Sequence, residues 1–265
     1  MNNILRKIFK FLIPMRFRRL KYWVDNRVWC VTNGMVCNGP FSKLKGSALD
    51  SSIPLLDPAF LLGSWEKELN IELERLFGFR FDKIINIGAA EGYFAVGLLM
   101  RCQDCDEVAF ETIPVYHEQI RKLAEINGVS NRLRIEGFCN LDTLRKTLVG
   151  CRRPFLFVDA EGYEKDLLNP EAIPELRDSF MVVECHDFRD NSITPTLMTR
   201  FSATHEIHMV FSHSQYRGIK DLPFTLGIVE RMLCSRIYAK ILSEGRGNIM
   251  HWLIMRPRSS GPENV

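Results

Sequence analysis

The N-terminal part of this chain of 265 residues lacks an apolar run that could cross a lipid bilayer, because Arg6, Lys7 and Lys10 interrupt it. It also lacks the small-residue cleavage site of a secretory signal. Cys102 and Cys105 form a lone C-x-x-C with no second pair at the spacing of a structural zinc site. The eight cysteines are scattered, which favours reduced thiols and a cytoplasmic location.

Negative charge is scarce at the N-terminus. Residues 1–28 hold eight Lys or Arg and one Asp, a balance of +7, which leaves −4 for the rest of the chain when taken from the total of +3. The body therefore lacks the basic surface of a nucleic-acid-binding protein, and no zinc-finger or RNA-binding motif is present. With 46% hydrophobic and 25% charged residues, the composition fits one globular catalytic domain with an extension.

The basic N-terminal segment, residues 1–28, has an apolar helical face made of Ile4, Leu5, Ile8, Phe9, Leu12 and Ile13. Such a segment, residues 1–21 in particular, can bind the anionic inner face of a membrane and make the protein peripheral there. It can equally pack on its own domain or on a partner, and the sequence leaves both open. Turn signals then predict an irregular lead-in at 29–62, a catalytic domain at 63–256 and a frayed tail at 257–265.

The chain is organised around residues 83–95, KIINIGAAEGYFA, in which a short apolar run ends in a turn of small residues. An amphipathic segment, 93–101, follows at once, so the stretch predicts a strand, a tight loop and a helix, the opening unit of a nucleotide-binding α/β domain. Gly88 permits a backbone conformation that a Cβ would resist, and Gly92 lets the helix begin close to the sheet. Ala89 keeps the loop surface low, so a flat ligand can lie on the main chain.

Two glycines of the dinucleotide fingerprint are missing from this loop, at Ala90 and Tyr93. A bound pyrophosphate needs them because it approaches the backbone and the helix N-terminus closely. A ligand without phosphates, such as S-adenosylmethionine, makes weaker demands on the loop. The missing glycines therefore argue against a nicotinamide-dependent oxidoreductase.

Further apolar runs alternate with helical patterns after this unit. Strands are predicted at 107–111, 132–137, 154–159, 179–185, 206–211 and 250–255. Two late helices are predicted at 194–201 and 226–242, and an earlier one at 65–77 with Ser64 as its N-cap. The pattern predicts a Rossmann-like, seven-stranded and mostly parallel sheet with helices on both faces, the last strand inserted antiparallel, preceded by an N-terminal extension.

Small or polar residues follow each of the first five strands. In open α/β sheets, ligands bind outside the carboxyl ends of the strands. The candidates that fall there are Gly88, Glu111, Phe138, Asp159 and His186. Glu111 lies 23 residues past Gly88, about the distance at which such domains place an acid on the ribose hydroxyls, and an adenine could stack near Phe138.

Five runs between about residues 60 and 190 carry a family resemblance. They are LGSWEKEL at 62–69, NIGAAEGY at 86–93, FE at 110–111, VDAEGYE at 158–164 and VECH at 183–186. Together they resemble the FkbM-like methyltransferases, a branch of the class I enzymes that use S-adenosylmethionine. The resemblance implies methyl transfer from S-adenosylmethionine to an oxygen of a sugar or of a sugar-bearing small molecule.

The resemblance also implies a cofactor site. Its predicted members are Asn86, Gly88, Ala89, Glu91, Gly92, Glu111, Phe138 and Asp159. Asn86 departs from the family pattern, because an acid is more usual at this position. Its carbonyl oxygen can still accept a hydrogen bond from the ammonium of the cofactor, without the charge of a carboxylate.

A hydroxyl acceptor must lose its proton as the new bond forms. We expect His186 or Asp159 to accept that proton, and Glu161 and Glu184 to orient the acceptor. In the alternative interpretation, His186 only closes a turn and Glu184 is a structural buried carboxylate. These side chains could also gather Mg²⁺ together with Asp187, although their spacing across two strands fixes no geometry, so a divalent metal is not favoured.

Three hypotheses for the function follow. The preferred one is an O-methyltransferase acting on a glycan or glycosylated small molecule, with no nucleic-acid partner. An NAD(P)-dependent oxidoreductase is the second. The third is a catalytically silent Rossmann-like interaction module at a membrane surface, which Asn86 and the basic N-terminus keep open. Residues 29–62 and 226–242 are expected to shape the acceptor pocket, but the sequence names neither the acceptor nor the oligomeric state.

Overall fold

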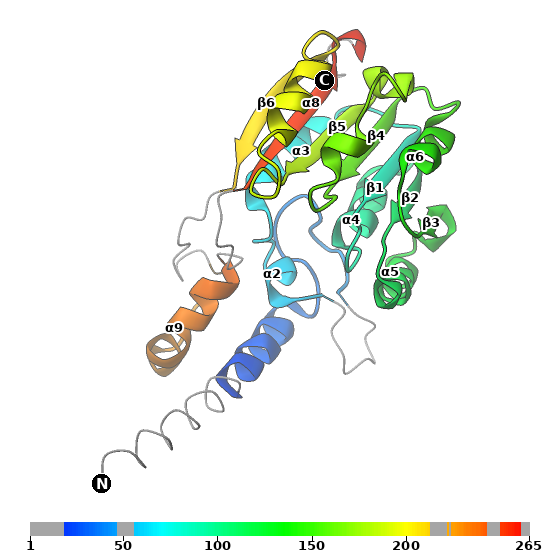
Figure 1. The fold of residues 1–265 in the computed structure, drawn as a ribbon. Coiled ribbons are helices and arrows are strands. Elements are labelled where there is room, and N and C mark those ends of the chain that lie inside the picture. The colour runs from blue at the N-terminus through cyan, green and yellow to red at the C-terminus, as the bar shows by residue number, and fades with distance from the viewer. Residues whose placement is uncertain (1–18, 47–55, 213–221, 223, 243–249, 261–265) are drawn as a thin grey trace.

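A computed structural model describes residues 19–46, 56–212, 222, 224–242 and 250–260 of the chain (Figure 1). These residues form a seven-stranded sheet in the order β3-β2-β1-β4-β5-β7-β6. The order runs outward in both directions from β1 and β4, as in doubly wound sheets that bind ligands where the strand order reverses. The predicted Rossmann-like fold is therefore confirmed.

The strands lie within two residues of their predicted ends. They are β1 Lys83–Ile87, β2 Asp106–Phe110, β3 Leu133–Glu136, β4 Pro154–Val158, β5 Phe180–Cys185, β6 His205–Phe211 and β7 His251–Pro257. Strands β1 to β5 pair in parallel, and β7 pairs antiparallel with both β5 and β6. The last strand is thus inserted antiparallel, as predicted.

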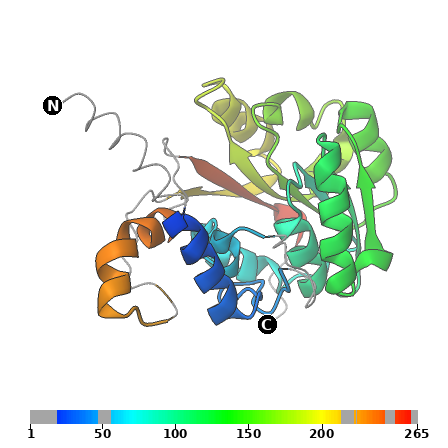
Figure 2. The ribbon, with the colours of Figure 1, turned by 90° about the horizontal axis from the view of Figure 1, so that it is seen from below.

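Helices cover both faces of the sheet (Figure 2). The chain forms α4 Tyr93–Arg101, α5 Pro114–Ile126, α6 Leu141–Leu148, α7 Glu164–Leu167 and α8 Ile193–Phe201. Strand β4 is buried throughout, and its side chains alternate between two apolar clusters. Phe157 packs in the cluster that holds Leu98 of α4, whereas Leu156 packs in the cluster that holds Leu144 of α6. This two-sided burial explains why the sequence of β4 is apolar until Asp159.

The first described helix, residues 19–32, lies below the sheet in Figure 1. Residues 19–32 are helical, so helix continues past the predicted boundary at residue 28. Short elements follow: α2 Pro58–Leu61, the 3-10 turn η1 Lys67–Leu69 and α3 Asn70–Leu76. Helix α9, Ile228–Leu242, lies beside helix 19–32. Along this helix, Ile228 and Met232 are exposed whereas Ile237 and Ile241 are buried.

The predicted helix at 65–77 is wrong in its first turn. The hydroxyl of Ser64 donates to the carbonyl oxygen of Ala59 at 3.1 Å instead of capping a helix. Glu66 has a φ of +46°, a left-handed conformation that no helix interior accommodates. The α-helix therefore starts at Asn70, and the residues before it turn toward the sheet.

The predicted amphipathic face at Ile4 to Ile13 lies outside the described residues. Among the helices that are described, none combines the length and apolar composition needed to cross a membrane. At the other end, β7 continues to Pro257 and Arg258–Ser260 form the 3-10 turn η5, with the amide of Arg258 donating to Thr204. Ordered structure thus continues beyond residue 256.

Candidate functional site

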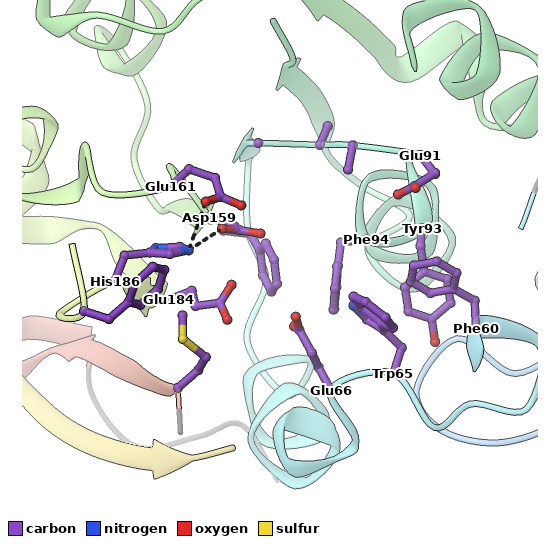
Figure 3. A pocket seen from close by; sticks show the side chains of 16 residues that line it. Phe60, Trp65, Glu66, Glu91, Tyr93, Phe94, Asp159, Glu161, Glu184 and His186 are labelled. Atoms are coloured by element: carbon purple, nitrogen blue, oxygen red, sulfur yellow. Dashed lines mark ion pairs between the residues drawn. The ribbon is translucent and has the colours of Figure 1, made fainter. Parts of the chain in front are cut away.

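Two adjoining cavities open at the carboxyl edge of the sheet. One, the His186 cavity, has a volume of about 340 Å³ and lies between the strand ends and the α2–η1 segment (Figure 3). The other, the Glu111 cavity, has a volume of about 350 Å³ and lies over the ends of β1, β2 and β3. Gly88, Ala90, Asp159 and Glu161 line both. A ligand that fills one cavity can therefore reach into the other.

The loop after β1 forms the partition between the cavities. Gly88 has a φ of +84°, and a Cβ built there would lie 1.9 Å from the carbonyl oxygen of Asp159. Only glycine fits this close approach of two strand ends. Ala89 and Glu91, two of the predicted cofactor residues, line the His186 cavity and not the Glu111 cavity. Gly92 lines neither cavity and instead begins α4 with a φ of +88°.

Glu111 lies where a ribose-binding acid was predicted. Its carboxylate lines the Glu111 cavity and is largely buried. One oxygen accepts a hydrogen bond from the amide of Ala90 at 2.8 Å, and the other accepts one from Ile113 at 2.7 Å. These bonds fix the plane of the carboxylate, and each oxygen keeps a second lone pair for a ligand hydroxyl.

Phe138 also lies where it was predicted, at the side of the Glu111 cavity. Its ring is exposed, and its centroid is 5.6 Å from that of Tyr163 at an angle of 38°. Cys139 and Ile113 line the same cavity. An exposed aromatic face among apolar neighbours suits the stacking of a flat heteroaromatic ring.

Asn86, like Gly92, is a predicted cofactor residue that lines neither cavity. It is fully buried in β1. Its neighbour is the buried Glu107, whose pKa is raised well above the ordinary value by burial, an effect that Asn86 partly offsets. An acid at position 86 would place a second carboxyl group beside Glu107, and like charges in an apolar interior disfavour each other. The presence of asparagine at position 86 thus has a local structural reason.

The four predicted catalytic residues converge in the His186 cavity (Figure 3). His186 Nε2 lies 3.5 Å from Asp159 Oδ1 and 3.8 Å from Glu161 Oε2. Glu184 lines the same cavity beside Asp159. Arg189 reaches Glu161 from outside at 2.7 Å. The ends of β4 and β5 therefore bring a histidine and three carboxylates to one point.

Glu164, at the start of α7, holds His186 from behind. Its Oε1 lies 2.7 Å from His186 Nδ1 and accepts a hydrogen bond from the amide of Gly162 at 3.0 Å. The side chain of Glu164 is fully buried. No role was predicted for this residue, although it ends the DAEGYE run. Its position five residues after Asp159, in the same run, was the sequence feature that could have placed it at the site.

The pKa values of Asp159 and His186 are both shifted upward in this cluster. Burial, together with the charge of Glu184, raises the pKa of Asp159 well above its usual range. Burial alone would lower the pKa of His186, but its hydrogen bond to Glu164 and the charges of Glu164, Asp159 and Glu184 outweigh that effect and raise it. Both groups therefore hold a proton more tightly than they do in water.

The opposite wall of the His186 cavity was not predicted in detail. It is aromatic, with side chains from α2, the α2–η1 segment and α4, namely Phe60, Trp65, Tyr93 and Phe94. Residues 29–62 and 226–242 were expected to shape the acceptor pocket. The first segment contributes Phe60 to the cavity, whereas no described residue of α9 lines it. The described lining holds five carboxylates and neither lysine nor arginine; the acids are Glu66, Glu91, Asp159, Glu161 and Glu184.

Three of these side chains have the geometry of a metal-binding group. One ligand atom from each of Asp159, Glu184 and His186 lies within 4.8 Å of the others. Asp187, which was grouped with them as an alternative magnesium ligand, accepts a hydrogen bond from the amide of Thr194 at 3.0 Å and belongs to another contact. The same three side chains could instead act as a proton acceptor with two neighbouring acids. The geometry is therefore compatible with metal binding and with proton transfer.

Comparisons with known proteins give distant likenesses. No protein-family model matches the sequence, and no curated protein matches it. Similar solved structures include precorrin-6y C5,15-methyltransferase from Geobacter metallireducens, with 13% identity over 70% of this chain and 85% of that one and a TM-score of 0.45.

Two further neighbours are O-methyltransferases. TomG from Streptomyces achromogenes, in complex with S-adenosylmethionine, has 19% identity over 71% of this chain and 78% of its own, with a TM-score of 0.43. An O-methyltransferase from Bacillus cereus, in complex with S-adenosylhomocysteine, has 14% identity over 72% and 81%, with a TM-score of 0.44. At this distance the fold rests on the strand order given above, and none of these proteins says what this chain binds.

Proposed function

We propose that the protein is an S-adenosylmethionine-dependent O-methyltransferase of the FkbM-like branch, acting on a sugar hydroxyl of a glycan or glycosylated small molecule. The observation that supports it best is the pair of cavities that share Gly88 and Asp159. One has the acid and the aromatic face that suit an adenosine. The other has an oriented histidine that suits a proton acceptor.

The residues of the Glu111 cavity fit an adenosine-bearing methyl donor. Glu111 offers two fixed carboxylate oxygens at the end of β2, where a ribose diol can donate to both. Phe138 offers a ring face for the adenine. When bound there, S-adenosylmethionine would supply a methyl group on a positively charged sulfur, and the shared loop would let that group face the His186 cavity.

His186 is the group proposed to take the proton of the acceptor hydroxyl. Glu164 is acceptor-only when ionised, so it fixes the neutral imidazole with its hydrogen on Nδ1 and leaves Nε2 bare toward the cavity. During methyl transfer, His186 would accept the proton of the acceptor hydroxyl at Nε2. Glu184, whose ligand atom lies within 4.8 Å of that of His186, then faces the imidazolium and stabilises its positive charge.

The lining of the His186 cavity favours a neutral, hydroxyl-rich acceptor. Carboxylates accept hydrogen bonds from pairs of hydroxyls, and aromatic faces such as that of Trp65 pack on the C–H face of a sugar ring. An acceptor that carries a phosphate or carboxylate would meet five acidic side chains and no described lysine or arginine. We therefore expect neutral or amino sugars to be accepted and anionic sugars to be rejected.

An acceptor panel tests this proposal. The full chain would be incubated with S-adenosylmethionine and matched neutral glycosides, amino sugars, uronic acids and sugar phosphates, and the products analysed by mass spectrometry for one added methyl group. The proposal expects methylated neutral or amino sugars. Methylation of the anionic set alone, or of a peptide or nucleic acid in parallel reactions, would overturn the sugar assignment.

A further inference from the structure

Two neighbouring helices expose apolar side chains. Helix α9 exposes Ile228, Val229, Met232 and Leu233, and helix 19–32 exposes Tyr22 and Trp23. Ile228 and Met232 are 82% and 78% exposed. An apolar groove runs between the two helices, with Leu20 and Trp23 on one wall and Leu233 on the other. We call these residues the helix-pair face.

The helix-pair face belongs to a fixed part of the fold. The other side of α9 is buried, with Ile237 and Tyr238 in the same core cluster as Val24 of helix 19–32. Tyr238 donates to Glu230 at 2.6 Å, and Glu230 pairs with Arg27 of the neighbouring helix at 3.8 Å. Helix α9 is therefore apolar on both sides: its inner side packs in the core, and its outer side has no packing partner among the described residues.

Exposed cationic side chains lie on the same two helices. Arg231 and Arg236 of α9 and Arg19 of the other helix are exposed. Residues 1–18, which lead directly into helix 19–32, contain five further Lys or Arg and no acid. The rest of the protein has the opposite balance, since residues 29–265 carry −4. Both helices of the pair thus expose cationic as well as apolar side chains.

We propose that the helix-pair face docks on the surface of an anionic lipid bilayer. Ile228, Met232 and Trp23 would enter the boundary between headgroups and acyl chains, while the arginines stay at the level of the phosphates. A protein interface of this composition would instead have to cover the cations at its rim with acids of a partner. Anionic lipid satisfies both the apolar and the cationic side chains without a specific partner.

Docking in this way would hold the candidate site on the membrane side. Helix α2 contacts α9, and its Phe60 lines the His186 cavity. Figure 1 shows α2, α9 and helix 19–32 together below the sheet. A bilayer under the helix-pair face would therefore lie on the same side of the His186 cavity as its α2 wall. The docking proposal itself does not depend on the proposed chemistry.

Vesicle sedimentation with the full chain tests the proposal. The probes are vesicles of phosphatidylserine with phosphatidylcholine, compared with phosphatidylcholine alone, at low and high salt. The first variant, Ile228→Ser with Met232→Ser, should bind the anionic vesicles about tenfold or more weakly. The second variant, Arg231→Glu with Arg236→Glu, should bind the anionic vesicles about 25-fold or more weakly. Each cation at an anionic surface contributes about fivefold to the affinity.

Matched controls change the same residue types on other helices. Ile71→Ser with Val115→Ser removes two aliphatic side chains that are 66% and 69% exposed, and Arg145→Glu with Lys146→Glu reverses two exposed cations of α6. Both controls should bind anionic vesicles as well as the unchanged chain. Far-ultraviolet circular dichroism and thermal unfolding check that every variant is folded.

Three results would overturn the proposal. The first is equal binding to neutral and anionic vesicles at all salt concentrations. The second is loss of binding in the controls as large as in the α9 variants. The third is an oligomer in sedimentation velocity that the Ile228→Ser, Met232→Ser variant converts to a monomer, which would assign the helix-pair face to a second copy of the chain.

Discussion

His186 Nδ1 lies 2.7 Å from Oε1 of Glu164, a carboxylate with no solvent exposure. This contact sets both the orientation and the charge of the imidazole. It leaves Nε2 directed into the His186 cavity, toward Asp159 at 3.5 Å. An imidazole fixed by a buried carboxylate on one nitrogen and open on the other is equipped to accept a proton.

The first prediction concerns the dependence of rate on pH. Only neutral His186 can accept a proton, and its pKa is raised, so kcat/KM should rise with pH through that pKa and then level off. Glu164→Gln removes a charge that raises this pKa and should move the rise to lower pH. His186→Gln should lower kcat by about 10²–10⁴-fold. Both should leave binding of S-adenosylhomocysteine unchanged.

Glu125→Gln, which neutralises an exposed glutamate on α5, is the control and should leave the pH profile in place. A rise that stays at the same pH in Glu164→Gln would show that Glu164 does not set the charge state of His186. Full activity in His186→Gln would remove the histidine from the proton transfer.

The second prediction concerns Glu111. Glu111→Ala should weaken binding of S-adenosylhomocysteine by about 1.5–3 kcal/mol, because it removes charged hydrogen bonds to the ribose. Glu111→Gln keeps one acceptor oxygen and should weaken binding by less. Calorimetry measures both dissociation constants, and His186→Gln supplies the matched variant from the other cavity. An unchanged dissociation constant in Glu111→Ala would contradict the ribose assignment.

The third prediction concerns the stability of the fold. The raised pKa of Asp159 means that the folded state binds its proton more tightly than the unfolded chain does. Stability contributed at this position therefore falls as pH rises above the ordinary aspartate value of about 3.9. Asp159→Asn should raise Tm at neutral pH by about 2–4 °C, which corresponds to on the order of 1 kcal/mol in a chain of this size, while abolishing activity.

This gain should vanish in acid, below the ordinary aspartate pKa, where the unfolded chain is protonated as well. Asp104→Asn, at an exposed position, is the control and should leave Tm unchanged at either pH. A lower Tm in Asp159→Asn at neutral pH would mean that the ionised carboxylate stabilises the fold.

Strand positions were predictable because burial dictates composition. Strand β4 is buried on both faces, so Pro154–Val158 had to be apolar and Asp159 marked the end of the run. The start of α3 was not predictable from its apolar spacing. Ser64 bonds to Ala59, and Glu66 takes a left-handed conformation next to the cavity, so long-range packing replaced the local capping signal.

The site residues at the ends of the parallel strands could be predicted from the sequence, whereas those contributed by other segments could not. Glu111, Asp159 and His186 follow strand ends, and the topology brings them to one edge. Phe60 and Met250 reach the same cavity from α2 and from the start of β7, and no spacing in the sequence relates them to β4. Asn86 was predicted to contact the cofactor because of its place in a motif. Its burial beside Glu107 depends on the pairing of two strands, which the motif does not show.

The fourth prediction separates proton acceptance from metal binding. Asp159, Glu184 and His186 could hold a divalent ion, but the proposed mechanism requires none. Dialysis against a chelator should leave kcat/KM unchanged, and added Mg²⁺ or Mn²⁺ should not raise it. Loss of activity with the chelator, restored by one of these ions, would reassign His186 from base to ligand.

The most direct test of the central claim is calorimetric titration of the folded 265-residue chain with S-adenosylhomocysteine, with NADH and NADPH as controls. The account predicts micromolar binding of S-adenosylhomocysteine and no binding of either nicotinamide. Binding of a nicotinamide, or no binding of S-adenosylhomocysteine by protein that unfolds cooperatively, would contradict it.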